Sequence, residues 1–231
     1  MEQYLKGKTV LVTGAGWGIG AATALLYAAC GANVIVSDTS RKGGRDTLAK
    51  IKSQKGTATY IRTDVSDAVA CEKLINRTIE TYGSIDIACN NSTIFSASTD
   101  PALILTSLRN CMQYEIEAML KQGGGIIVNT SSIIGKISSA SLNSFVRAKY
   151  GTTTLLQNTF RGYGCRGIHI NTIAPAFINT ALLMASIQPE KEWQVKLPPR
   201  DMPRMAQKVA GLVLWLSTDK THLLPTAYNE N

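Results

Sequence analysis

A cluster of glycines follows the first apolar run of the chain, and its spacing suits phosphate binding. The run Thr9–Thr13 leads directly into GAGWGIG, which contains Gly14, Gly16, Gly18 and Gly20, and then into an alanine-rich segment with a helical pattern. Glycine permits a tight turn and a close approach to a pyrophosphate, and the next helix offers free N–H groups. Glycines also mark ordinary turns, but their position between a strand and a helix favours a phosphate cradle.

A carboxylate stands at the end of the second apolar run. Asp38 lies eighteen residues after Gly20, where it is able to accept hydrogen bonds from the adenosine ribose and to repel a 2′-phosphate. This favours NAD over NADP. Arg41 and Lys42 offer charge that would soften the preference, and an exposed acid at a strand end is the alternative interpretation.

These residues need a parallel sheet to bring them together. Near-continuous apolar runs, typical of strands covered on both faces, alternate with helical patterns. The alternation predicts one α/β domain, a three-layer α/β/α Rossmann fold with a doubly wound parallel sheet. The predicted strands are 9–13, 33–37, 58–62, 85–90, 126–130 and 168–172, and the predicted helices lie near 18–30, 42–54, 67–82, 102–121, 143–163 and 204–217.

Length and composition agree with a compact single domain over residues 1–231. Hydrophobic residues make up 45% of the chain and charged residues 17%, which argues against disorder. We expect an irregular substrate flap at about 175–203 and a weakly ordered tail at 218–231. The first strand begins too early for a signal peptide, and the longest apolar run, near 21–30, is too short to cross a membrane.

Charge and cysteine content exclude several function classes. The net charge is +8, but the cations are scattered, which argues against nucleic-acid binding. Five dispersed cysteines without a CxxC pair indicate reduced thiols in a cytoplasmic protein. With only two histidines, a metal site is not expected.

Further motifs follow in a fixed order, and together they resemble the classical short-chain dehydrogenase/reductase family over nearly the whole chain. They are TGxxxGxG with Thr13, Gly14, Gly18, Ile19 and Gly20; Asp64 and Val65 after the third strand; Asn90 and Asn91 at the end of the fourth; IIVNTSS, which includes Ser132; FVRAK from Phe145 to Lys149; and a turn with Pro175 and Ile178. The resemblance implies that Asp64 and Val65 lie near adenine, and that Lys149, Pro175 and Ile178 lie near the nicotinamide side.

The resemblance also implies a reaction site, from which this chain departs at one residue. In the family a tyrosine hydroxyl transfers the substrate proton, a lysine holds the ribose and lowers the tyrosine pKa, and a serine orients the substrate oxygen. Ser132 and Lys149 occupy the serine and lysine positions, but Phe145 occupies the tyrosine position. General acid–base help is worth about 10²–10⁴-fold. Tyr150 is a poor substitute, because it lies about 100° around the helix from Lys149.

Other departures affect the same region. Ser92 and Thr93 replace the family's Ala-Gly, Ala176 replaces a glycine, and Ile104 stands where a proton-relay asparagine is expected. Two functions therefore stay open. One is a slow NAD-dependent oxidoreductase acting on a small-molecule alcohol or carbonyl. The other is a dinucleotide-binding sensor, scaffold or inactive oligomer partner. In either case we expect a homo-oligomer, at least a dimer, without nucleic acid or membrane.

Overall fold

The computed structural model describes residues 3–91, 101–130, 163–173, 175 and 202–218, with only the backbone for 101, 102, 104 and 202–205. The strands are β1 (Thr9–Thr13), β2 (Asn33–Asp38), β3 (Thr57–Arg62), β4 (Ile87–Asn90), β5 (Gly125–Thr130) and β6 (Ile168–Ile173). The helices are α1 (Gly18–Ala29), α2 (Arg41–Ser53), α3 (Ala68–Tyr82), α4 (Pro101–Gln122), the 3₁₀ turn η2 (Gly164–Arg166) and α7 (Met202–Leu216).

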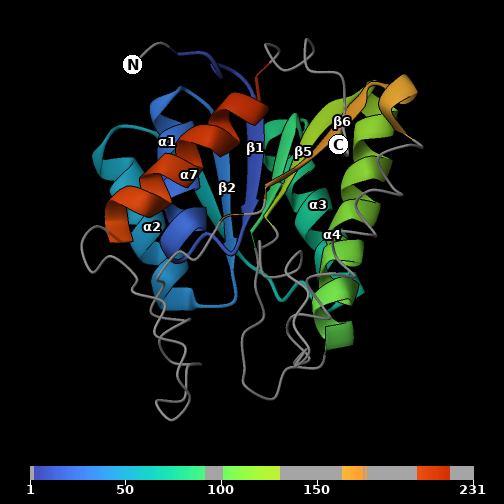
Figure 1. Ribbon diagram of the computed structural model, residues 1–231, viewed down its shortest axis with the longest axis horizontal. Helices are drawn as coiled ribbons and strands as arrows, with labels where there is room; N and C mark the ends of the chain where they lie inside the picture. Colours follow the sequence, from blue (N-terminus) through green and yellow to red (C-terminus); the bar gives the residue numbers. More distant parts are fainter. Residues whose placement is uncertain (1–2, 92–100, 131–162, 174, 176–201, 219–231) are drawn as a thin grey trace, which may run out of the picture.

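The six strands form one parallel sheet in the order β3-β2-β1-β4-β5-β6 (Figure 1). The chain builds outward from β1 to β3 and then returns to place β4 on the other side of β1. Strand order therefore reverses between β1 and β4. In open α/β sheets, ligands bind at the carboxyl ends of the strands beside such a reversal, so Thr13 and Asn90 mark the expected site.

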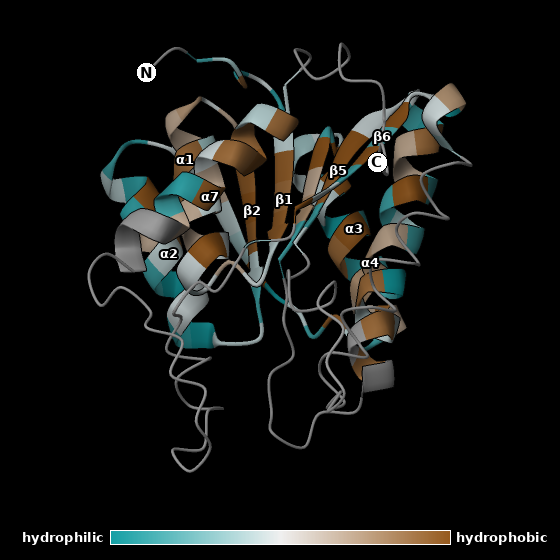
Figure 2. Ribbon diagram, in the orientation of Figure 1, coloured by the Kyte–Doolittle hydropathy of each residue, from teal (hydrophilic) through white to brown (hydrophobic). Residues whose placement is uncertain are grey.

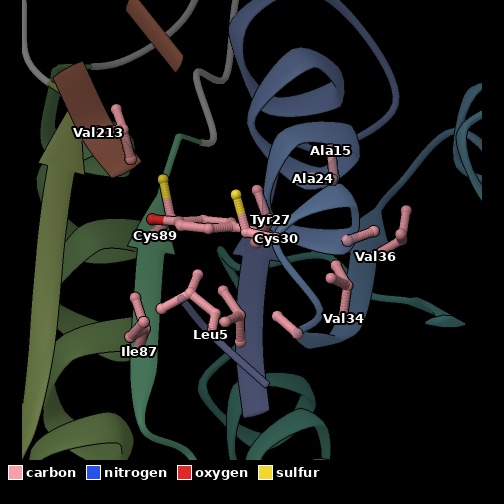
Figure 3. Packing of buried hydrophobic residues seen from close by; sticks show 14 of the residues in the cluster. Leu5, Ala15, Ala24, Tyr27, Cys30, Val34, Val36, Ile87, Cys89 and Val213 are labelled. Atoms are coloured by element: carbon pink, nitrogen blue, oxygen red, sulfur yellow. The ribbon is translucent and has the colours of Figure 1, made fainter. Parts of the chain in front are cut away.

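Two hydrophobic clusters cover the two faces of the sheet, because successive strand residues point to opposite sides. Val10 and Val12 belong to the cluster beneath α1, α2 and α7, whereas Leu11 belongs to the cluster beneath α3 and α4. Figure 2 shows the central strand β1 largely in the brown of hydrophobic residues. In Figure 3, Tyr27 of α1 reaches across the first cluster toward Cys89 of β4.

The predicted Rossmann fold is confirmed, with small changes at the ends of elements. The fourth strand begins at Ile87 rather than at residue 85. Ile85 lies outside the strand because the Gln122 side chain takes both of its backbone groups, accepting from its N–H at 3.1 Å and donating to its carbonyl at 2.7 Å. Asp67 is the cap before α3, since its carboxylate accepts from the Val69 N–H at 2.8 Å.

Several predicted elements lie outside the described residues. These are the helix at 143–163 apart from Tyr163, most of the flap at 175–203, and the tail beyond Thr218. The division into a single domain stays a prediction. Within the described ranges, every helix is too short or too polar to cross a lipid bilayer.

Candidate functional site

The glycine loop after β1 turns back tightly and presents the start of α1. Gly14 and Gly18 have φ angles of 62° and 53°, in the left-handed region that favours glycine. The Ala15 N–H donates to the carbonyl of Ser37 at 3.0 Å, which ties the loop to the end of β2. Trp17 precedes α1 without capping it by a side-chain hydrogen bond, and the first turn has no acidic residue. The helix N-terminus is thus available to an anion.

Close packing leaves no room for a side chain at two positions of this loop, Gly16 and Gly20. A Cβ atom added to Gly20 would lie 2.2 Å from the Gly14 carbonyl oxygen and 2.7 Å from Asn91 Nδ2. One added to Gly16 would lie 2.8 Å from the carboxylate carbon of Asp38. The absence of side chains at these two points leaves the backbone open to close approach by a ligand, which is the property that a pyrophosphate cradle needs.

Asp38 lies beside the loop, where its carboxylate is held from two sides. One oxygen accepts from the Gly16 N–H at 2.8 Å, and the other accepts from the Ser40 N–H at 2.7 Å. Ser40 in turn caps α2 by accepting from the Gly43 N–H at 3.1 Å. The carboxylate is therefore fixed next to the glycine loop and keeps lone pairs for further donors, such as ribose hydroxyls.

Positive side chains surround the same strand end. Tyr60 donates to the backbone carbonyl of Asp38 at 3.0 Å. Its pKa is raised, first by burial and then by the Asp38 charge, while Arg62, Arg41 and Arg45 act to lower it. Three guanidinium groups thus lie within electrostatic range of the tyrosine that supports Asp38. Of these three, Arg41 is the one that the sequence analysis named, together with Lys42, as a source of positive charge near Asp38.

The segment expected to contact adenine follows β3. Asp64 accepts at one carboxylate oxygen from both the N–H and the hydroxyl of Ser66, at 3.0 and 2.7 Å. Val65 is buried against Cys71 and Cys111. Its carbonyl accepts from Asn110 Nδ2 of α4 at 3.3 Å. The loop is therefore fixed by α3 and α4 on one side.

Thr13, Asn90 and Asn91 meet at the reversal of strand order. The Thr13 hydroxyl donates to Asn90 Oδ1 at 3.5 Å and accepts from the Asn91 N–H at 3.3 Å. Asn91 Nδ2 donates to the carbonyl of Gly14 at 3.5 Å. The two asparagines at the end of β4 thus contact the end of β1 and the glycine loop.

The reaction half of the predicted site lies largely outside the described residues. Ser132, Phe145, Lys149 and Ile178 are in the undescribed ranges, as are Ser92, Thr93, Tyr150 and Ala176. Pro175 is described and half-buried, two residues after β6. The roles assigned to these residues of the reaction site stay predictions. In the described part of the chain, no group of histidine, cysteine, aspartate and glutamate side chains is suited to a metal ion.

One buried polar group at the site escaped the sequence analysis. Glu115 of α4 is fully buried and accepts from Asn90 Nδ2 at 2.8 Å, and the same amide nitrogen donates to Asn129 Oδ1 at 3.0 Å. The sequence does indicate that this residue is buried, because Glu115 lies three residues after Met112 and four before Met119, on the buried face of the helix.

The strand order and the loop geometry define the Rossmann class of α/β proteins. Residues 8–191 match the short chain dehydrogenase family. The chain is 34% identical to the short chain dehydrogenase/reductase astE of Aspergillus oryzae, over 93% of this chain and 89% of the relative. It is 32% identical to a cyclohexanol dehydrogenase of an Acinetobacter species, over 95% and 91%.

A solved structure of similar shape is a 7α-hydroxysteroid dehydrogenase in complex with NADH and 7-oxo glycochenodeoxycholic acid. It has a TM-score of 0.79 and 26% identity, and covers 94% of this chain and 89% of that one. The chain belongs to the short-chain dehydrogenase/reductase family, a family of oxidoreductases that use NAD(P) and act on small-molecule alcohols or carbonyls.

Proposed function

We propose that this protein binds NAD(H) in preference to NADP(H) and interconverts a secondary alcohol and its carbonyl slowly, because Phe145 stands in place of the proton-transferring tyrosine. The observation that carries the cofactor proposal is the fixed carboxylate of Asp38, which accepts from Gly16 and Ser40 beside the glycine loop. A negative charge held there favours two ribose hydroxyls and disfavours a 2′-phosphate.

In this proposal, different residues bind the cofactor and orient the substrate. The free N–H groups at the start of α1 bind the pyrophosphate, and Asp38 binds the adenosine ribose. Lys149 holds the nicotinamide ribose and Ser132 orients the substrate oxygen. When bound, the dinucleotide supplies the hydride acceptor or donor. Phe145 lines the site but has no hydroxyl, so the proton must pass through a water beside Lys149 and Ser132.

Cofactor choice is tested by titrating the protein with NADH and NADPH and following nucleotide fluorescence. We expect micromolar affinity for NADH and weaker binding of NADPH. Asp38→Ser should raise the ratio of NADPH to NADH affinity, because it removes the charge that opposes the 2′-phosphate. The ratio is the informative quantity, since a general loosening of the loop weakens both nucleotides alike. Equal affinity of the wild type for both would contradict the preference, and no binding of either would overturn the whole proposal.

Turnover is tested by restoring the missing hydroxyl. Phe145→Tyr should raise the rate on a panel of cyclic secondary alcohols and ketones by about 10²–10⁴-fold. The panel begins with cyclohexanol, the substrate in the name of one relative. Tyr150→Phe is the matched control, because it removes the neighbouring phenol. If Tyr150→Phe abolishes the wild-type rate, Tyr150 is the acid and the role given to Phe145 is wrong.

A second function is favoured by Phe145 itself. The protein would then bind the dinucleotide without turnover, as a sensor, a scaffold or an inactive oligomer partner. This reading predicts normal NADH binding and no gain from Phe145→Tyr on any substrate of the panel. The sequence also predicts a homo-oligomer, at least a dimer, and a cytoplasmic location. Analytical ultracentrifugation would measure the oligomeric state.

A further inference from the structure

Buried polar side chains form a connected group under the carboxyl ends of β1, β4 and β5. Asn90 lies at its centre. Its Nδ2 donates to Glu115 Oε2 at 2.8 Å and to Asn129 Oδ1 at 3.0 Å, while its Oδ1 accepts from the Thr13 hydroxyl at 3.5 Å. These four side chains are at most 5% exposed. The group links α4 to three neighbouring strands at the reversal of strand order.

Within this group, burial of the Glu115 carboxyl group is unfavourable for the stability of the fold. Its side chain is 0% exposed, no cation among the described residues forms an ion pair with it, and its Oε1 has no hydrogen-bond partner there. Cys89 and Cys111 are near enough for its charge to act on them. Burial raises the pKa of Glu115 to about 7, although the Asn90 hydrogen bond acts to lower it. Because burying a carboxyl without full pairing destabilises a fold, a methionine or leucine here would serve packing better.

The hydrogen bonds of the group lead to the phosphate loop. Thr13 accepts at its hydroxyl from the Asn91 N–H, and Asn91 Nδ2 donates to the carbonyl of Gly14. That carbonyl oxygen is the nearest atom that a Cβ added to Gly20 would meet. The position of the Asn90 amide therefore bears on the loop that would hold the pyrophosphate, and Glu115 fixes that amide from the side of α4.

We propose that Glu115 is a positioning residue for the dinucleotide site, acting through Asn90 and Thr13 on Asn91 and the Gly14 carbonyl. It touches neither the cofactor nor the substrate. This inference rests on the proposed binding of NAD(H). The carboxyl group contributes to the site because it accepts a hydrogen bond from Asn90, which an apolar side chain of the same length is unable to do.

Two substitutions separate this role from packing. Glu115→Gln keeps a carbonyl oxygen that accepts from Asn90, and Glu115→Met keeps the length and loses the acceptor. We expect Glu115→Met to raise the dissociation constant of NADH about tenfold, within the roughly 2- to 30-fold range of coupled residues. Glu115→Gln should stay within about threefold of wild type. Rescue by glutamine but not by methionine is the signature of a hydrogen-bond acceptor.

The matched control is Met119→Ala, one turn further along α4. Met119 is fully buried and packs against Gly125 at the start of β5, at the opposite end of the strands from Asn90. Met119→Ala should lower the melting temperature and leave the dissociation constant of NADH unchanged. Should Met119→Ala weaken NADH as much as Glu115→Met does, the role of Glu115 is structural only and the inference is overturned.

A further substitution covers the case in which Glu115→Met does not fold. Thr13→Val preserves the shape of the side chain and removes the next link of the chain, so it should weaken NADH by a similar factor. If it binds NADH like wild type, the inference fails. In the double variant the two effects should not add, because both break one path. Wild-type protein that binds neither NADH nor NADPH overturns the proposed function, whereas tight binding by wild type and Glu115→Met alike overturns only this inference.

Discussion

Gly20→Ala tests the phosphate cradle most directly, because one methyl group is aimed at the carbonyl of the loop. The new Cβ would lie 2.2 Å from the Gly14 oxygen. Ordinary contact is about 3.5 Å, so the loop or the helix must move by about 1 Å. Overpacking of this kind costs about 1–3 kcal/mol. Alanine regains about 1 kcal/mol over glycine in a helix, and the net loss of stability is therefore about 0–2 kcal/mol.

The effect on binding should be larger than the effect on stability. A shift of about 1 Å misaligns N–H groups that donate to phosphate, and a hydrogen bond to a charged group is worth about 1.5–3 kcal/mol. We therefore expect the dissociation constant of NADH to rise about 10- to 100-fold, measured by fluorescence titration beside a thermal melt. The control is Gly211→Ala in α7, where an added Cβ meets nothing, and which should stabilise the protein without affecting NADH. A Gly20→Ala protein that binds NADH within twofold of wild type would refute the reasoning.

Two further predictions concern stability. Tyr27 is fully buried and its hydroxyl lies 2.7 Å from Ser217 Oγ, so Tyr27→Phe should lower the free energy of unfolding by about 1 kcal/mol in urea denaturation; an unchanged value would contradict the bond. Burial acts to raise the pKa of Asp86, but hydrogen bonds from the Thr9 N–H, Lys8 and Ser84 outweigh it and leave the pKa lowered. Its stabilisation is therefore complete above the unfolded-state pKa of about 4 and is lost as the pH falls through the folded pKa. Asp86→Asn should flatten the fall of melting temperature below pH 4, and an unchanged slope would count against this assignment.

The strand positions were predictable because a strand that is buried on both faces appears in the sequence as a continuous apolar run. Val10, Leu11 and Val12 are all fully buried, and a run of this kind has few other interpretations in an alternating α/β pattern. The structure then pairs Thr13 with Asn90 at the carboxyl ends of β1 and β4. The strand β4 begins two residues later than predicted, because an apolar run does not reveal that a distant glutamine side chain takes the backbone groups of Ile85.

Tertiary hydrogen bonds were not predictable in this way. The sequence suggested that Asp38 faces a ribose, but not that Gly16 and Ser40 fix its carboxylate. Glu115 lies in a segment with a second glutamate, Glu117, which is exposed, and composition alone does not distinguish the two. Only the helical spacing from Met112 and Met119 marks Glu115 as buried, and its partner Asn90 is 25 residues away in sequence.

With Phe145 at the tyrosine position, as the sequence predicts, nucleotide binding and turnover would depend on different kinds of structure. The cradle consists of backbone N–H groups and glycines beside the ends of β1 and β4, so several separate contacts support it. Proton transfer depends on a single hydroxyl oxygen, and replacing tyrosine by Phe145 keeps the shape of the ring. We therefore expect a single substitution at position 145 to remove turnover without affecting folding, whereas a substitution in the cradle, such as Gly20→Ala, should weaken NADH binding only in part. Measurement of NADH affinity and of the Phe145→Tyr rate in the same preparation tests this asymmetry, because weak binding together with an ordinary wild-type rate would reverse it.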